Sequence, residues 1–210
     1  MFVGHYGAAA AARSSGVKLW HGFVAVQFLD ILWAPFILLG VESVRIAPGF
    51  TEANALDLHH MPYTHSLAAA LFWSVVVAGA WRLILRKRGA LIMGGLVFSH
   101  WVFDFLVHTP DLPLWPGGPK VGLGLWNTIE YSLPLELGVF IIGYGVYLLR
   151  TTGGRLAAAV TLAAGLALQA VANFGPPPAS PDEAAISALV AYAVFIALAV
   201  WNDATRQLKG

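Results

Sequence analysis

The feature that most constrains this chain is a series of apolar stretches, each about as long as a helix that crosses a lipid bilayer. Such a helix needs about 20 mostly apolar residues. Five stretches meet this requirement directly: residues 19–41, 66–85, 90–108, 155–174 and 183–201. A sixth, residues 129–150, also contains Glu130, Pro134 and Glu136. Proline is tolerated near a helix start, where its missing N–H would have no partner anyway, so we count this stretch as a span.

The composition agrees with a membrane protein. Hydrophobic residues make up 58% of the 210 residues and charged residues only 11%, whereas soluble domains carry about 25% charged residues. The formal net charge of +1 gives no reason to expect nucleic-acid binding, which shows as a basic patch or stripe. The sequence therefore predicts an all-α, polytopic transmembrane bundle of about six spans that forms one integral-membrane domain over residues 1–210.

The basic residues predict how the bundle is oriented. Loops rich in Lys and Arg stay on the cytoplasmic side of a membrane. Of the 12 Lys and Arg residues, only Arg45 and Lys120 fall at one face in the six-span arrangement. The other ten fall at the opposite face: Arg13, Lys18, Arg82, Arg86, Lys87, Arg88, Arg150, Arg155, Arg206 and Lys209. We therefore expect both termini in the cytoplasm and the loops around His59 and Asp111 on the other side.

The first residues, 1–12, form a separate apolar segment. They lack the basic leader of a cleaved signal peptide, so we keep them in the mature protein. As a helix they would reach only about 18 Å, which is too short to span. We expect a half-helix that dips into the bundle or a segment that lies at the membrane interface.

Several ionisable residues lie at membrane depth, where they normally face a partner or a wet cavity. Asp30 and His100 lie in the middle of their spans, each about 16 Å from the basic end by helix rise. His100, Asp104 and His108 recur at i, i+4 and i+8, so they form one stripe along a single helix. His65 opens the second span, where a neighbouring hydroxyl can cap the helix.

This pattern indicates a metal site without thiolates, because the chain has no cysteine. His100 and Asp104 offer two ligands from successive helical turns, and Asp30 and His65 could complete a tetrahedron, with His5 as a fifth candidate. The alternative is a buried hydrogen-bonded pair that locks two helices together. His65 can also be read as an interfacial histidine. The remaining histidines fit interfacial, loop or helix-end positions: His21, His59, His60 and His108.

With these motifs in this order, the chain resembles the predicted membrane-bound metal-dependent hydrolases, a YdjM-like family of bacterial inner-membrane proteins. The matching pieces cover most of residues 1–127. They are Gly4-His5, Leu29-Asp30-Ile31-Leu32-Trp33, Tyr63-Thr64-His65-Ser66-Leu67, Ser99-His100-Trp101-Val102-Phe103-Asp104 and His108-Thr109-Pro110-Asp111 with the residues that follow up to Pro116.

The resemblance implies a metal held by the matched polar residues, and an inner-membrane location. Because the donor set has about four to five nitrogen and oxygen ligands and no thiolate, we expect one tightly held divalent ion. The implied ligands are His5, Asp30, His65, His100 and Asp104. Zinc suits nitrogen and oxygen ligands, and a hydrolase sited between helices would act on a lipid or another membrane-resident ester or phosphoester. Asp104 is then a catalytic candidate as well as a ligand, and Glu136 is a candidate general base.

Two other functions stay open at this point. Chains of intramembrane His and Asp also form ion pathways, which would make the protein a metal or proton transporter. Transporters usually show two related halves with interrupted helices, and the sequence shows no such halves. A third possibility is a non-catalytic protein whose metal only joins its helices.

Overall fold

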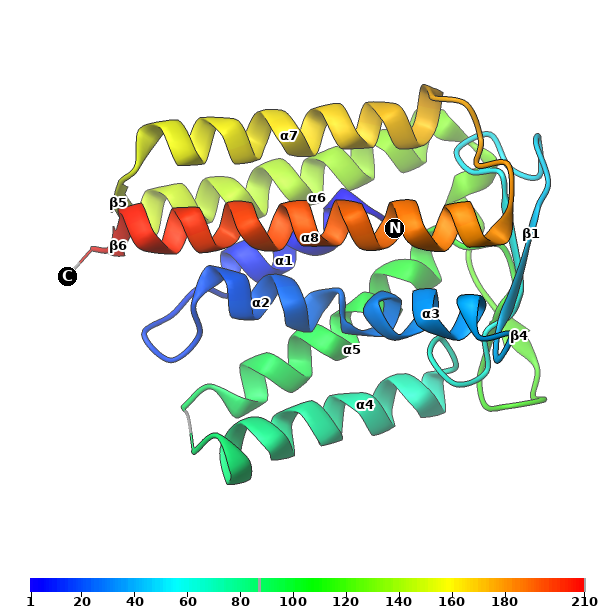
Figure 1. The fold of residues 1–210 in the computed structure, drawn as a ribbon, viewed down its shortest axis with the longest axis horizontal. Helices are drawn as coiled ribbons and strands as arrows, with labels where there is room; N and C mark the ends of the chain where they lie inside the picture. The colour runs from blue at the N-terminus through cyan, green and yellow to red at the C-terminus, as the bar shows by residue number, and fades with distance from the viewer. Residues whose placement is uncertain (87, 210) are drawn as a thin grey trace.

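The structure is a computed structural model that describes residues 1–86 and 88–209 (Figure 1). Lys87, one of the basic residues that predict the orientation, lies outside the described residues. The prediction of an all-α bundle is confirmed. The helices are α1 (Val3–Ala11), α2 (Leu19–Val26), α3 (Phe28–Leu38), α4 (Leu67–Gly79), α5 (Ala90–Val107), α6 (Ile129–Arg150), α7 (Arg155–Phe174) and α8 (Pro181–Thr205), with a π-helical turn η1 (Ala80–Ile84) after α4 and a 3-10 turn η2 (Leu125–Asn127) before α6.

Within residues 1–86 and 88–209, five helical segments are long and apolar enough to cross a membrane: α4 with η1, and each of α5, α6, α7 and α8. The predicted first span differs, because it is broken into α2 and α3, which are bent by 49°. The break lies at Gln27, whose φ of −101° and ψ of 8° leave the helical range. Its side chain donates a hydrogen bond to Asp30, so the break lies directly beside one of the predicted ligands.

The N-terminal helix α1 lies inside the bundle and is not at its surface (Figure 1). It packs against α6 with the two backbones in contact: a Cβ added at Gly7 would lie 2.1 Å from the carbonyl oxygen of Val139, and one at Gly143 would lie 2.1 Å from that of Gly7. Small residues allow such close helix approach. Of the two expectations for residues 1–12, the half-helix within the bundle is the one the structure shows.

An aromatic core fixes α1 from its other side. The ring of Tyr6 stacks on Phe195 of α8 at 4.0 Å between centroids and lies 4.7 Å from Phe23 of α2. Phe140 of α6 reaches the same Phe195 edge-on. Because Tyr6 follows His5 in the sequence, this core also fixes where the His5 imidazole points.

In the described part of the chain, three short two-stranded antiparallel ladders, which the sequence did not predict, close the ends of the bundle. β1 (Ser43–Ile46) with β2 (Leu56–His60), and β3 (Leu112–Pro113) with β4 (Lys120–Val121), lie at one end. β5 (Thr151–Gly153) and β6 (Arg206–Leu208) pair at the opposite end (Figure 1). Strands β1 and β4, which contain Arg45 and Lys120, therefore lie at the opposite end of the bundle from the C-terminal strand β6 (Figure 1).

Candidate metal centre

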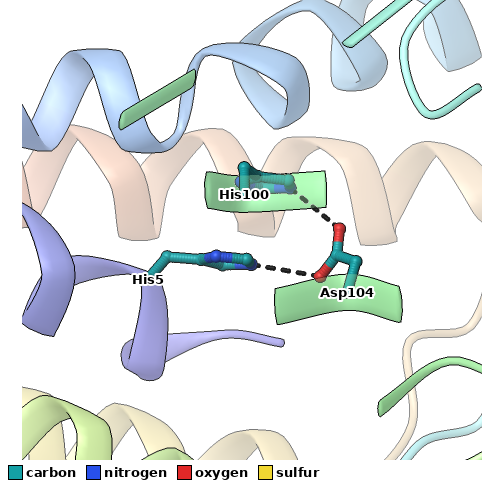
Figure 2. Close-up of side chains that lie close together, drawn as sticks. All are labelled: His5, His100 and Asp104. Carbon is teal, nitrogen blue, oxygen red and sulfur yellow. Dashed lines mark hydrogen bonds and ion pairs between the residues drawn. The ribbon is translucent and has the colours of Figure 1, made fainter. Parts of the chain in front are cut away.

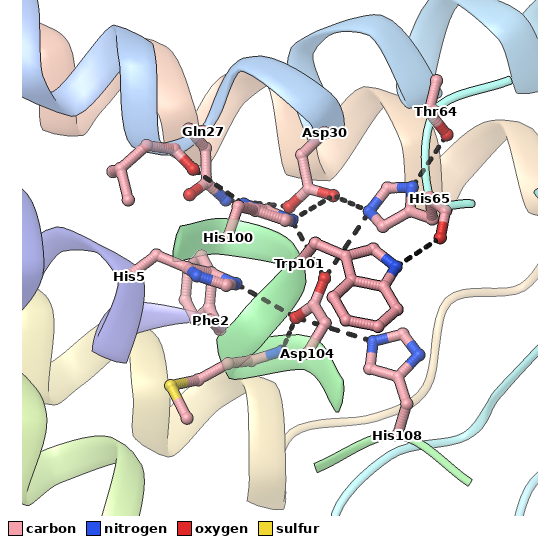
Figure 3. A network of polar contacts seen from close by, with 12 residues as sticks. Phe2, His5, Gln27, Asp30, Thr64, His65, His100, Trp101, Asp104 and His108 are labelled. Carbon is pink, nitrogen blue, oxygen red and sulfur yellow. Dashed lines mark hydrogen bonds and ion pairs between the residues drawn. The ribbon is translucent and has the colours of Figure 1, made fainter. Parts of the chain in front are cut away.

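The predicted ligands come from four different parts of the chain and meet in the interior of the bundle (Figure 3). His5 comes from α1, Asp30 from α3, His65 from the turn before α4, and His100 and Asp104 from α5. Asp30 is partly buried and the other four are buried. The structure therefore brings together all five residues that the resemblance implied.

Asp30, His65 and His100 form one group of donor atoms that could hold a metal ion. Oδ1 of Asp30 lies 3.1 Å from Nε2 of His65 and 3.5 Å from Nε2 of His100. In a tetrahedral zinc site with bonds near 2.0–2.1 Å, neighbouring ligand atoms lie about 3.3–3.4 Å apart. The distances from the Asp30 oxygen to the two imidazole nitrogens fit that requirement.

His5, His100 and Asp104 form a second such group (Figure 2). Nε2 of His5 lies 3.1 Å from Oδ1 of Asp104, and Nε2 of His100 lies 3.0 Å from Oδ2 of the same carboxylate. The two imidazoles stack with centroids 3.8 Å apart and planes at 4°. His100 thus belongs to both groups, and the two Asp104 oxygens face different imidazoles.

Hydrogen bonds on the far side of two imidazoles determine which nitrogen faces the carboxylates. His100 donates from Nδ1 to the carbonyl oxygen of Val26 at 2.7 Å. Thr64 donates its hydroxyl to Glu42 at 2.6 Å, so its oxygen accepts from Nδ1 of His65 at 2.7 Å. In a neutral imidazole, Nε2 then carries only a lone pair. A lone pair that faces a carboxylate oxygen requires a cation between them or a second proton on the ring, and metal-ligating histidines are oriented in this way.

Asp30 is held in place by groups that the sequence did not identify. Its Oδ2 accepts hydrogen bonds from Gln27 at 2.8 Å and from the hydroxyl of Tyr192 in α8 at 2.9 Å. Oδ1 is thereby directed at His65 and His100. The only sequence signal for Tyr192 is a hydroxyl in the middle of an apolar span, which by itself does not show what it contacts.

His108 also belongs to the cluster, although the sequence, which places it on the stripe with His100 and Asp104, indicated a helix end and not a ligand. Its Nε2 lies 3.7 Å from Oδ1 of Asp104, and its Nδ1 lies 2.9 Å from Oδ1 of Asp111. Thr109 donates to the other Asp111 oxygen at 3.1 Å. The spacing of His108 four residues after Asp104 indicates that the two side chains lie on the same face of the helix. In the same way, the spacing of Asp111 three residues after His108 indicates that these two side chains can make contact.

Glu136 lies beside the cluster and is in neither donor group among the described residues. Its oxygens accept hydrogen bonds from the backbone N–H of Phe2 at 2.7 Å and the indole of Trp126 at 3.1 Å. The amino group of Met1 hydrogen-bonds Oδ1 of Asp104. Glu136 therefore ties the N-terminal segment to α6, and its role as a base stays a prediction.

A family model described as YdjM inner membrane protein matches residues 3–176. That range contains all five predicted ligands together with His108, Asp111 and Glu136, and it ends before α8. No curated protein and no solved structure matches the chain.

Proposed function

This chain belongs to the YdjM inner membrane protein family, and we propose that it is a membrane-embedded, metal-dependent hydrolase acting on a lipid or another membrane-resident ester or phosphoester. The observation that carries the proposal is the buried cluster in which Nε2 atoms of His65 and His100 face the carboxylates of Asp30 and Asp104. Ionisable groups at membrane depth are costly and normally serve function.

We propose that the ion is held by Asp30, His65, His100 and Asp104, with His5 against the far oxygen of Asp104. The donor set is nitrogen and oxygen with no cysteine in the chain, which suits zinc. When bound, zinc would supply an activated water and polarise the scissile group.

In this proposal the protein's own groups orient the ligands and move a proton. Asp104 aligns His5 and His100, because each of its oxygens lies within 3.1 Å of one imidazole nitrogen. Glu136 accepts the proton of the attacking water: each of its oxygens accepts one N–H and keeps a further lone pair.

Replacing Glu136 by Gln tests this role. The amide keeps the size of the side chain and one of its two acceptor oxygens but removes its basicity. We therefore expect the metal to stay bound and the protein to fold with a lower melting temperature, while turnover falls by about 10²–10⁴-fold. Hydrolysis of radiolabelled total membrane lipid and elemental analysis of the same sample give the two measurements. Unchanged turnover would exclude Glu136 as the base.

The enzyme proposal as a whole is tested by removing ligands. His100→Ala and Asp104→Ala should each lose the ion held with Asp30 and His65 and lose lipid hydrolysis with it, while His59→Ala, in strand β2, should keep both. If the unmodified protein hydrolyses no lipid extract, and metal loss from His100→Ala only lowers the melting temperature, a structural metal that joins the helices replaces the enzyme proposal.

We further propose that the protein crosses the inner membrane several times, with lipid as its partner and both termini in the cytoplasm. The bent pair α2 and α3 would form the sixth span beside the five long apolar helices. Ten of the 12 Lys and Arg residues fall at the predicted cytoplasmic face, and this bias supports the orientation.

One observation favours transport as a second candidate function. Transporter sites often lie at broken helices, and the break at Gln27 lies beside Asp30. Proteoliposomes loaded with a zinc-sensitive dye distinguish the two functions. Zinc entry that His100→Ala abolishes, in protein without lipid hydrolysis, would favour the transporter.

A further inference from the structure

The carboxylate of Asp104 faces two separate pairs of imidazoles (Figure 3). Its Oδ2 lies 3.0 Å from Nε2 of His100 and 3.7 Å from Nε2 of His65. Its Oδ1 lies 3.1 Å from Nε2 of His5 and 3.7 Å from Nε2 of His108. The four distances bracket the separation of about 3.3 Å between ligand atoms around one tetrahedral zinc ion.

His100 cannot ligate a metal ion on both sides of this carboxylate. It belongs to both donor groups, but its Nδ1 is already bonded to the carbonyl oxygen of Val26. A neutral imidazole has one lone pair for a metal, so His100 can ligate a single ion. If that ion is the one with Asp30 and His65, the His5 side of Asp104 needs another ligand.

His108 has the surroundings of such a ligand. It is buried, and Asp111, which is also buried, lies 2.9 Å from its Nδ1. The indole of Trp126 covers the ring at 4.3 Å between centroids. A carboxylate on the second nitrogen of a metal-bound histidine fixes the ring and strengthens it as a ligand. Nε2 of His108 is thereby directed toward Asp104.

We propose that the protein binds a second divalent cation through His5, His108 and Oδ1 of Asp104, with Asp104 shared between the two ions. This inference rests on the proposed function, because it presupposes the first ion at Asp30, His65 and His100. The amino group of Met1 hydrogen-bonds the same Oδ1, so this side of Asp104 already accommodates a positive charge. The second ion would take over that oxygen from the amine.

Zinc stoichiometry tests the inference without any enzymatic assay. Detergent-purified protein is stripped with a chelator, reloaded with Zn²⁺ alone, desalted and analysed for zinc per chain. We expect two equivalents in the unmodified protein. His108→Ala and His65→Ala should each retain one, because each variant loses a ligand of only one ion. Asp111→Asn should weaken the second site by about 10–100-fold, as expected for a partner of a ligating histidine.

His59→Ala is the matched control, because His59 lies in β2, where its Nε2 pairs with Ser43; it should retain two equivalents. If the unmodified protein holds one equivalent of zinc, the second ion is excluded, whatever the zinc content of His108→Ala. The proposal of the first ion is not affected by that result. Two equivalents in His108→Ala, or one in His59→Ala, also overturn the inference. No zinc at all in the unmodified protein would instead remove the proposed function. The count in the unmodified protein decides the question even if a variant fails to fold.

Discussion

Tyr192→Phe is the substitution that most specifically probes how Asp30 is held. The change removes one hydroxyl, whose hydrogen bond to Oδ2 of Asp30 is 2.9 Å long, and keeps the ring that packs in α8. Gln27 still donates to the same oxygen at 2.8 Å. We therefore expect Asp30 to remain near its position with one support fewer.

The size of the effect follows from the charge of Asp30. A hydrogen bond to a charged group contributes about 1.5–3 kcal/mol, and about 1.4 kcal/mol corresponds to a tenfold change in affinity. Loss of a group that orients a metal ligand typically lowers metal affinity by about 10–100-fold. We expect Tyr192→Phe to weaken zinc binding within that range, measured by competition with a chromophoric chelator.

Tyr144→Phe provides the matched control. The hydroxyl of Tyr144 is also buried, but it donates hydrogen bonds to the carbonyl oxygen of Ala158 at 3.2 Å and to Oδ1 of Asn202 at 3.3 Å, away from the cluster. This variant should lose thermal stability and keep its zinc affinity. If Tyr192→Phe binds zinc as tightly as the unmodified protein, Tyr192 does not position Asp30 for a metal, and its hydrogen bond serves helix packing alone.

Two further predictions concern the placement of the chain. Cysteines at Phe50 and Leu123, both exposed, should react with an impermeant maleimide on intact spheroplasts, whereas a cysteine at Arg88 should react only after the membrane is opened; the reverse pattern would refute the orientation. Gly7→Ala should reduce zinc content and thermal stability, because its Cβ would meet a backbone carbonyl of α6 at 2.1 Å and push α1 with its histidine away. Gly138→Ala, whose Cβ meets nothing within 4 Å, should keep both, and an equal loss in the two variants would contradict this role of α1.

The helical bundle could be predicted from hydropathy because each long helix carries its own signal. The predicted ranges 129–150 and 155–174 coincide with α6 and α7. The break at Gln27 could not be predicted in the same way. Hydropathy averages over a window, and a single polar residue that bonds Asp30 changes that average little.

The charged residues of the candidate site could be predicted, because burying an ionisable side chain at membrane depth costs free energy. Asp30, His100 and Asp104 stand out because charge at membrane depth needs a partner. Tyr192 does not stand out, since a tyrosine in an apolar span is common and its partner lies 162 positions away. The sequence places Asp111 in a loop between two spans, and only the fold shows that its carboxylate lies against His108.

The central claim, that the buried His and Asp cluster holds a metal ion, is tested most directly by elemental analysis of protein purified without chelator. We predict that the unmodified protein retains at least one equivalent of zinc per chain. His100→Ala should hold one equivalent less than the unmodified protein and Asp104→Ala should hold none, since Nε2 of His100 and Oδ2 of Asp104 lie only 3.0 Å apart and the other Asp104 oxygen faces His5. The absence of any transition metal above background, in protein prepared from several growth media, would contradict the claim.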